Sequence, residues 1–257
     1  MKRFNLQKIT KVTNSIFHTE KVQISKEEDE KVQISKEEDE KSNDPYKIYC
    51  FWTGNNKMSD RRVKCLRQLQ VVSNCKVILI TPENLSQYLL PDQPLHPAYN
   101  YLCHTHKADY LRTYFMHFKG GAYSDIKCTT GSWKEYIDLL RNEESIWAIG
   151  YQETKEGVAY VPYIENWKEL IGNCAYVFRP QTPLTTLWYN QMIELLDNKL
   201  NLLMKNPARH PQDSSEQGGG YPIEWNEMLG RIFHKWVYDY RDHIRRTLPT
   251  PIFNNYR

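Results

Sequence analysis

The sequence predicts an α/β fold with a mainly parallel central sheet flanked by helices. Stretches of strand character alternate with stretches of helical periodicity along most of the chain, as in folds whose parallel strands are joined by helices. The 257 residues include 18 Tyr, 8 Phe and 7 Trp, an aromatic content typical of a packed core and rare in disordered chains. The length is consistent with one or two domains.

A charged repeat separates the beginning of the chain from this body. The segment KVQISKEEDE occupies 21–30 and recurs unchanged at 31–40. Val and Ile are its only apolar residues, so the repeat cannot build a core. We interpret it as a solvated linker or charged helix, with a partner-binding tail as the alternative. The turn cluster over 42–45 then marks a boundary, which gives an N-terminal extension over 1–44 and a main domain over 45–257.

Residues 1–17 of this extension carry apolar side chains at nearly helical spacing among lysines. This pattern predicts an ordinary amphipathic segment or a peripheral contact with a partner or an anionic membrane surface. No apolar run approaches the roughly 20 residues that span a bilayer, so we expect no transmembrane segment. No apolar signal-peptide region is apparent either. We therefore expect a soluble protein of the cytoplasm.

Composition argues against several classes of function. The six cysteines form no CxxC pair, which leaves zinc-ribbon and thioredoxin readings without support and favours reduced, mostly buried thiols. The formal net charge is +3, with basic residues dispersed along the chain and no helix-turn-helix or RRM pattern. We therefore expect no binding to nucleic acid.

The first part of the main domain reads as strand, helix and strand. Residues 47–52 predict a strand that ends at the turn residues Thr53-Gly54-Asn55-Asn56. Helical periodicity follows over 60–72. The apolar run 76–80 then predicts a short buried strand, because Thr81-Pro82 closes it.

A second helix-and-strand pair follows. Residues 83–89 predict a short helix, and three prolines over 91–97 then impose a loop. Helical periodicity over 99–118 ends at Gly120-Gly121, and 122–127 returns as a strand.

The remainder continues the alternation. We expect a helix over 132–141, an extended stretch over 145–151 and a strand over 173–178. A long helix over about 183–203 follows, because Pro183 suits a helix start. The glycine- and proline-rich stretch 206–221 predicts a loop of the kind that often acts as a lid, and an amphipathic helix begins after Trp225.

Polar side chains concentrate around the helix 99–118 and the strand 122–127. Asp109 and Arg112 lie three residues apart and share a helix face. In a strand, Tyr123, Asp125 and Lys127 all point to one side. Ligands of such folds bind beyond the carboxyl ends of the strands, so this cluster predicts a binding site.

Two glycines connect these groups. Gly120 and Gly121 allow a tight reversal or the close approach of a ligand. A simpler interpretation also stands at this point: Asp109 and Arg112 would form a surface ion pair, and the glycines would only end a helix.

The whole string resembles the sugar-nucleotide signature of the DXD-type glycosyltransferases, in which D-x-x-R precedes G-G-x-Y and an x-D-x-D segment. Its pattern is most similar to the capsular polysaccharide synthesis and mannosyltransferase-like families, which have a GT-A fold. Residues 47–54 resemble the family's opening strand, and 171–183 resemble a later strand that precedes a helix. The signature residues here are Asp109, Arg112, Gly120, Gly121, Tyr123 and Asp125.

The resemblance implies a glycosyltransferase that moves a sugar from a nucleotide-sugar donor to a glycan or other hydroxyl acceptor. Trp52 would stack on the nucleotide base, with a core aromatic as the alternative, and Gly54 would let the backbone approach. Asp109 and Arg112 would hold the donor sugar and its phosphates or hydroxyls. Gly120, Gly121 and Tyr123 would complete the substrate site.

One position departs from the family pattern. The second aspartate of the DXD motif, usually the direct metal ligand, is replaced by Lys127. An ammonium group repels a divalent cation but can itself balance the charge of a diphosphate. We therefore expect Asp125 and Lys127 to be the catalytic pair, with weak or absent dependence on Mn²⁺ or Mg²⁺. Asp125 would be the metal ligand only if a metal is used. The alternative is a catalytically inert nucleotide-sugar or carbohydrate-binding protein.

The C-terminal third offers fewer signals. The resemblance implies that a helical segment here lies on the acceptor side. Asp213, Glu224 and Glu227 are candidate acid or base groups for an acceptor hydroxyl. A carboxylate in such a position is more often an ordinary surface group, which is the alternative for each of them.

Overall fold

The computed structural model describes residues 45–254. The amphipathic stretch 1–17 and the charged repeat 21–40 lie outside the described residues. Within the described part, six strands form one sheet in the order β2-β1-β3-β5-β4-β6. The strands are β1 (Lys47–Phe51), β2 (Lys76–Ile80), β3 (Gly121–Ser124), β4 (Ala148–Gln152), β5 (Ile171–Phe178) and β6 (Ile244–Arg245).

Strand direction explains where a site can form. β1 pairs in parallel with β2 and β3, and β4 pairs in parallel with β6, whereas β5 runs antiparallel to both β3 and β4. All the strands except β5 therefore share one direction, which confirms the predicted α/β fold with a mainly parallel sheet. The carboxyl ends of β1, β3 and β4 meet at one edge, together with the beginning of β5.

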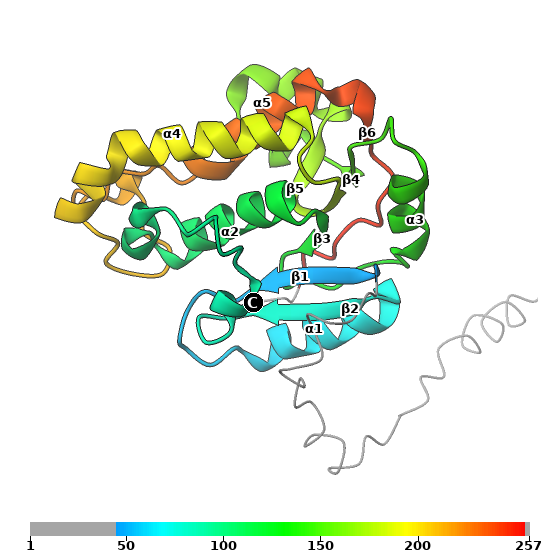
Figure 1. Cartoon of the computed structure of the whole chain (residues 1–257), viewed down its shortest axis with the longest axis horizontal. Helices are drawn as coiled ribbons and strands as arrows, with labels where there is room; N and C mark the ends of the chain where they lie inside the picture. Colours follow the sequence, from blue (N-terminus) through cyan, green and yellow to red (C-terminus); the bar gives the residue numbers. More distant parts are fainter. Residues whose placement is uncertain (1–44, 255–257) are drawn as a thin grey trace, which may run out of the picture. The chain divides into compact units, whose positions relative to one another are not determined.

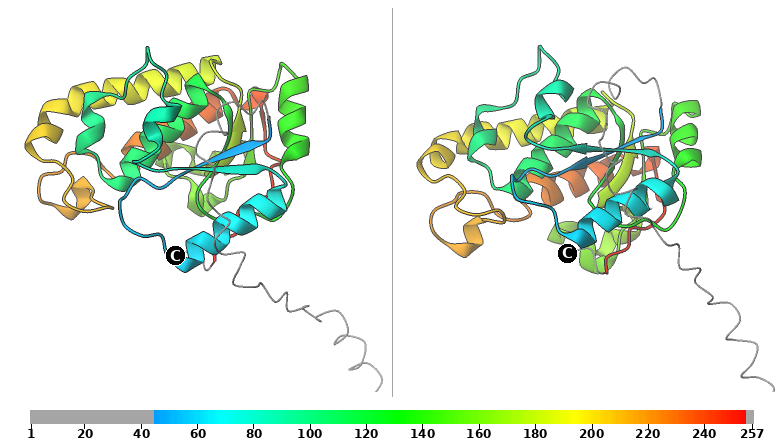
Figure 2. Two further views of the ribbon diagram at one scale, coloured as in Figure 1. Left: turned by 60° about the horizontal axis from the view of Figure 1, so that its bottom comes forward. Right: turned by 90° about the horizontal axis from the view of Figure 1, so that it is seen from below.

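Helices cover both faces of the sheet (Figure 1, Figure 2). On one face α2 and α5 pack against the long helix α4, and on the other α1 contacts β2 while α3 contacts β4 and β5. The helices are α1 (Asp60–Ser73), α2 (His104–Phe118), α3 (Lys134–Asn142), α4 (Pro183–Lys205) and α5 (Ile232–Asp239).

Alternation along the strands divides the interior into two cores. In β1, Ile48 and Cys50 face the core beneath α1 and α3, while Phe51 faces the core beneath α2, α4 and α5. The second of these cores is strongly aromatic: Tyr176 of β5 packs against Phe178 and Trp188. Many of the aromatic side chains of the sequence therefore pack on this side of the sheet.

Local signals account for the helices that were predicted well. The side chain of Ser59 accepts a hydrogen bond from the backbone N–H of Arg62 and begins α1, and Asn74 ends it in the left-handed conformation with φ of 56°. Thr182 caps α4 in the same way, with Pro183 at the first helical position, where proline loses no hydrogen bond.

The helix predicted over 99–118 begins later than expected. Pro97 starts a separate 3₁₀ helix over Pro97–Tyr101, and Leu102 and Cys103 are extended before α2 begins at His104. The short helix predicted over 83–89 is likewise reduced to a 3₁₀ turn over Leu85–Tyr88. Helical periodicity alone did not reveal these interruptions, because the side chains on both sides of the break face the same core.

The strand predicted over 122–127 ends at Ser124. The backbone N–H of Asp125 still donates to the carbonyl of Cys174, but Lys127 N–H then turns back to the carbonyl of Asp125. Asp125 and Lys127 therefore lie in a loop beyond the strand, and the strand alternation invoked for them is wrong. Their approach to Tyr123 is produced by this tight turn.

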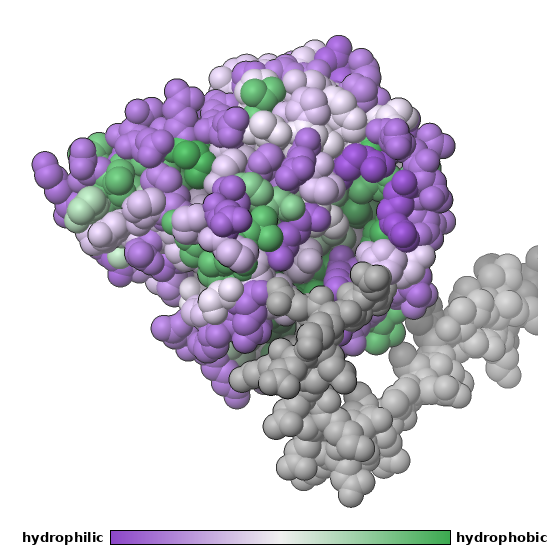
Figure 3. Space-filling model, viewed as in Figure 1, coloured by the Kyte–Doolittle hydropathy of each residue, from purple (hydrophilic) through white to green (hydrophobic). Residues whose placement is uncertain are grey.

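Several segments had no counterpart among the predicted elements. A 3₁₀ helix over Val161–Glu169 lies between β4 and β5, and β6 follows α5. The amphipathic helix predicted after Trp225 is present, but it begins with a π-helical turn over Glu227–Arg231 before α5. No helix within residues 45–254 is long and apolar enough to cross a membrane. In the view of Figure 3 the surface is mostly hydrophilic, with apolar side chains gathered in separate small areas.

Candidate functional site

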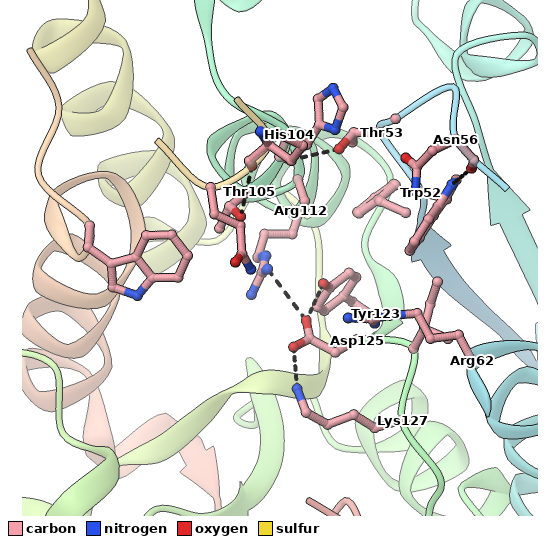
Figure 4. Close-up of a pocket in the computed structure, with 17 residues that line it drawn as sticks. Trp52, Thr53, Asn56, Arg62, His104, Thr105, Arg112, Tyr123, Asp125 and Lys127 are labelled. Carbon is pink, nitrogen blue, oxygen red and sulfur yellow. Dashed lines mark hydrogen bonds and ion pairs between the residues drawn. The ribbon is translucent and has the colours of Figure 1, made fainter. Parts of the chain in front are cut away.

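A cavity of about 380 Å³ lies where β1 and β3 end (Figure 4). The loop after β1 provides one wall, the turn after β3 the floor, and α2 a second wall. A segment of the C-terminal loop lines a further side of the cavity. The lining residues used below are Trp52, Gly54, Arg62, His104, Thr105, Ala108, Arg112, Tyr123, Asp125, Lys127, Pro211, Gln212 and Trp225.

Asp125 lies at the centre of the hydrogen-bond network in this cavity. One carboxylate oxygen accepts from the hydroxyl of Tyr123 at 2.5 Å, and the other accepts from Nζ of Lys127 at 2.5 Å. Arg112 Nη2 approaches the first oxygen at 3.4 Å. Burial by itself raises the pKa of Asp125, but the charges of Lys127 and Arg112 outweigh it and lower the pKa to about 2. Asp125 is therefore ionised at any physiological pH.

Arg112 connects this network to the protein interior. Its Nη2 lies 3.2 Å from Asp109, its Nη1 donates to the carbonyl of Asn173 at 2.8 Å, and its guanidinium lies 4.7 Å from the ring centre of Tyr123. Asn173 is available because β5 runs antiparallel and begins at this edge. Arg112 is 6% and Asp109 only 4% exposed, so the interpretation of Asp109 and Arg112 as a surface ion pair is wrong.

Asp109 supports Arg112 from behind and does not line the cavity. Burial raises the pKa of Asp109 to about 6, against the opposing charge of Arg112. An aspartate of the unfolded chain titrates near 3.9, so the folded protein holds this proton more tightly. The resulting stabilisation is fully present below about pH 4 and is lost as the pH rises through about 6.

The raised pKa of Asp109 predicts that the free energy of unfolding depends on pH through this one residue. We expect the wild type to lose on the order of 2 kcal/mol of unfolding free energy between pH 4 and pH 7 relative to Asp109→Asn, whose side chain does not titrate. Urea unfolding at pH 4, 5, 6 and 7 measures the difference. The exposed Asp92→Asn serves as control and is expected to follow the wild type at every pH. Parallel curves for Asp109→Asn and the wild type would contradict the assignment.

The two glycines of the signature lie outside the cavity lining. Gly120 and Gly121 have φ of 65° and 88°, and a Cβ atom on Gly120 would come within 3 Å of Phe178 and Pro180. Gly120 follows the C-cap of α2 with a positive φ, which agrees with the interpretation that the glycines end a helix. Close approach of a ligand to these glycines stays a prediction. Gly54 does line the cavity, and a Cβ there would collide with the ring of His104.

Trp52 forms the wall nearest to β1. Its indole Nε1 donates to the carbonyl of Asn56 at 2.8 Å, which fixes the ring at the mouth of the cavity. The guanidinium of Arg62 lies over this ring, 5.5 Å from its centre. Part of the indole also packs against the core beneath α1 and α3, which agrees with the core-aromatic interpretation of Trp52. Stacking of Trp52 on a nucleotide base stays a prediction.

Sequence reasoning missed several lining residues. His104, Ala108 and Arg112 follow one another at four-residue spacing and form one stripe of α2, so the helical period extended backwards from Arg112 contains a usable signal. No sequence signal identifies Arg62 as a lining residue, because nothing in the sequence distinguishes it from Arg61. Trp225 follows a glycine-rich loop, but its approach to the cavity depends on the path of that loop.

The C-terminal loop over 206–226 is fastened beside the cavity. Asp213 is fully buried and receives two hydrogen bonds from the guanidinium of Arg209, at 2.9 and 2.6 Å. Arg209 also donates to the carbonyl of Gly218, and the backbone N–H of Thr105 in α2 donates to the carbonyl of Pro211 at 3.2 Å. These contacts hold Pro211 and Gln212 against the site.

None of the three carboxylates considered as acid or base groups lines the cavity. Asp213 pairs with Arg209, Glu224 with Arg231, and Glu227 with Lys199. The idea that Asp213 is a surface carboxylate is wrong, because its side chain is enclosed by the loop that it fastens.

Among its lining residues the cavity offers a divalent cation one carboxylate, that of Asp125. Mg²⁺ and Mn²⁺ require several oxygen ligands, whereas both oxygens of Asp125 already accept from Tyr123 and Lys127. Nowhere between residues 45 and 254 do three His, Cys, Asp or Glu side chains gather into a metal-binding group. The position that would hold a second carboxylate presents an ammonium group instead.

Comparisons with known proteins add three findings. Residues 2–203 match the family model described as capsular polysaccharide synthesis protein. Among solved structures, the chain aligns with one titled PaToxG glycosyltransferase at a TM-score of 0.45 and 11% identity, covering 76% of this chain and 69% of the other. The comparison with curated proteins gives no match.

Proposed function

Because the chain belongs to the capsular polysaccharide synthesis family, we propose that it is a glycosyltransferase with a GT-A-like fold. It moves a sugar from a nucleotide-sugar donor to a hydroxyl group of a glycan or another acceptor. The observation that carries this proposal is the convergence of Trp52, Arg112, Asp125 and Lys127 on one cavity. An aromatic ring, two cations and a carboxylate suit the base, the phosphates and the hydroxyls of such a donor.

In the proposed reaction, the bond between the anomeric carbon and the diphosphate oxygen breaks while the acceptor oxygen bonds to that carbon, and the proton of the acceptor hydroxyl passes to solvent. Positive charge develops at the anomeric carbon, and negative charge develops on the leaving diphosphate. Lys127 and Arg112 are fixed cations beside the leaving group, and groups that need no reorganisation stabilise such charge most effectively. Asp125 orients both cations. One of its carboxylate oxygens binds Nζ of Lys127, and the other lies beside Nη2 of Arg112.

The same geometry supports a donor site that works without a divalent cation. Nζ of Lys127 lies at the position where the family pattern has a metal-binding aspartate, and the side chain is only 8% exposed. A buried ammonium group, held in place by a carboxylate, offers a compact positive charge to the diphosphate. We propose that Lys127 replaces the metal in this role.

We further propose that the loop over 206–226 covers the bound donor. It already contributes Pro211, Gln212 and Trp225 to the cavity. The three glycines over 218–220 all have positive φ, between 76° and 87°, a conformation that other residues rarely adopt. They form the turn that returns the loop to the site, and the Arg209–Asp213 pair fastens it.

The test is a thermal-shift panel of UDP-, GDP- and CMP-sugars, each measured with Mn²⁺ and with EDTA. A donor that binds only the folded protein stabilises it by about 2.7 kcal/mol at a hundredfold excess over Kd. For a domain of this size we expect the melting temperature to rise by roughly 5–10 °C with one nucleotide class, and to the same extent with either additive. Binding of none of the three classes would argue against a nucleotide-sugar enzyme.

Turnover separates the enzyme from its alternative. The replacement of a family aspartate by Lys127 also fits a protein that binds the donor without using it. Release of free sugar or nucleotide from the bound donor, measured with EDTA present, identifies the enzyme. Binding without release, with every acceptor class offered, would instead identify an inert donor-binding protein.

A further inference from the structure

Two thiols meet beside the cavity. Sγ of Cys65, in α1, lies 3.1 Å from Sγ of Cys128, in the turn that follows β3. All six cysteines of the chain lie within the described residues, and all six are free thiols. A disulfide bond joins its sulfur atoms at about 2.05 Å. The separation of Cys65 and Cys128 therefore exceeds a covalent bond by only about 1 Å.

Hydrogen bonds hold the two segments together around these thiols. Gln68 lies one turn after Cys65, and its Nε2 donates to the carbonyl of Thr129 at 2.7 Å. Oε1 of Gln68 accepts from the backbone N–H of Thr129 at 2.8 Å. The carbonyl of Cys128 accepts from the backbone N–H of Ile252, also at 2.8 Å. The backbone on both sides of the contact is thus fixed, so the two sulfur atoms are held facing each other.

The two thiols differ in their access to solvent. Cys65 is only 3% exposed, whereas Cys128 is the one cysteine of the six that is not buried. A reagent in solution therefore reaches Cys128 first. Burial and the neighbouring thiol of Cys65 raise the pKa of Cys128 to about 11. Since the thiolate is the nucleophile, the reaction of Cys128 is slow at neutral pH and quickens as the pH rises.

We propose that Cys65 and Cys128 form a redox-active site that small-molecule disulfides oxidise to an internal disulfide. The thiolate of Cys128 attacks one sulfur of the reagent, forms a mixed disulfide and releases the first reagent thiol. Cys65 then loses its proton and attacks Sγ of Cys128, which releases the second reagent thiol. The protein loses two electrons and two protons, and the reagent gains them as two thiols.

The place of this bond connects it with the cavity. Cys128 directly follows Lys127, and Cys65 lies one turn after Arg62; Lys127 and Arg62 both line the cavity. Closing the gap between the sulfur atoms draws the turn that carries Lys127 towards α1. A misplacement of about 1 Å in a catalytic site can lower a rate about a hundredfold. We therefore expect oxidation to lower turnover reversibly. This consequence rests on the proposed function, whereas formation of the bond does not.

Intact-mass measurement tests the bond, with the full chain treated with oxidised glutathione at pH 7 and pH 8.5. We expect the wild type to lose two hydrogen atoms, faster at pH 8.5, and to retain no glutathione. Peptide mapping is expected to join Cys65 to Cys128. Cys65→Ala lacks the second thiol, so glutathione should remain on Cys128, and Cys128→Ala should take up none.

Cys50→Ala is the matched control, because it removes another buried thiol from the core that contains Cys65. It is expected to be oxidised like the wild type. A wild type that keeps both thiols, retains glutathione, or joins any other pair of cysteines would overturn the proposal. Oxidation of Cys65→Ala to a product without glutathione would overturn it as well.

Stability and turnover show what the bond does. The two cysteines are 63 residues apart in the chain, so we expect the oxidised wild type to melt roughly 5–15 °C above the reduced protein. Turnover of the donor in EDTA should fall about ten- to a hundredfold on oxidation and return with dithiothreitol, while the rate of Cys128→Ala should not respond to the oxidant. Equal rates of oxidised and reduced wild type would overturn control of the site. Absence of turnover in the reduced wild type would count against the proposed function alone.

Discussion

Replacing Lys127 with methionine is expected to lower turnover of the donor by about a hundred- to a thousandfold, the usual effect of removing one preorganised group that stabilises developing negative charge. The ammonium group is buried and lies 2.5 Å from Asp125. Methionine keeps approximately the volume of the lysine side chain, but it offers no positive charge to the departing diphosphate. Steady-state rates with EDTA present measure the effect. Lys64→Met, at an exposed position of α1, is the matched control and is expected to leave the rate unchanged.

A second substitution at the same position separates a catalytic ammonium from a merely structural one. Lys127→Asp restores the pair of carboxylates that the family pattern contains. We expect this variant to be inactive in EDTA and to regain part of its turnover with Mn²⁺, because two carboxylates can then bind the cation. For the wild type, we expect equal rates with Mn²⁺ and with EDTA. Loss of wild-type turnover on chelation would overturn the metal-free proposal.

Replacing Arg112 with methionine is expected to destabilise the fold by about 3–5 kcal/mol, the usual cost of removing one partner from a buried ion pair. Asp109, only 4% exposed, would lose the guanidinium that lies 3.2 Å from its carboxylate, and the carbonyl of Asn173 would lose a donor. Urea unfolding at pH 7 measures the change. Arg141→Met removes an exposed ion pair with Asp138, in which the charged atoms lie 3.9 Å apart, and is expected to cost less than 1 kcal/mol.

A double variant tests the reason for this loss. In Arg112→Met with Asp109→Asn, no ionised carboxylate remains buried behind the cavity. We expect the double variant to be more stable than Arg112→Met alone, since the two residues are coupled. Additive losses from the two single changes would show that Asp109 and Arg112 do not depend on each other.

Much of the fold follows from short-range signals. The strand over 76–80 was predicted with its observed bounds, because an apolar run ends at Thr81-Pro82. The long helix α4 begins at Pro183 as expected. The end of β3 was not predictable in this way. Asp125 still bonds across to Cys174, and only the turn that follows, built within the folded sheet, removes Lys127 from the strand.

The residues of the candidate site also fall into a group that the sequence predicted and a group that only the fold brings together. Arg112, Tyr123, Asp125 and Lys127 all line one cavity, and the sequence motif contains all four. The strand alternation that the sequence suggested for Asp125 and Lys127 is not the reason, because a turn beyond β3 brings them there. Arg62 and the C-terminal loop reach the cavity only through the arrangement of α1 and α4 around the sheet. The burial of Asp109 could not be predicted from residue spacing either. Asp109 lies behind Arg112 and contacts its guanidinium, and it does not line the cavity.

The placement of the tryptophans gives the protein a built-in optical reporter. Trp52 and Trp225 line the cavity from different parts of the chain, whereas Trp133 and Trp188 are fully buried in the two cores. A nucleobase stacked on Trp52 would quench part of the intrinsic fluorescence without any added label. Closure of the loop would change the emission of Trp225 separately. Single phenylalanine replacements would therefore resolve donor arrival and loop movement as two distinct signals in time.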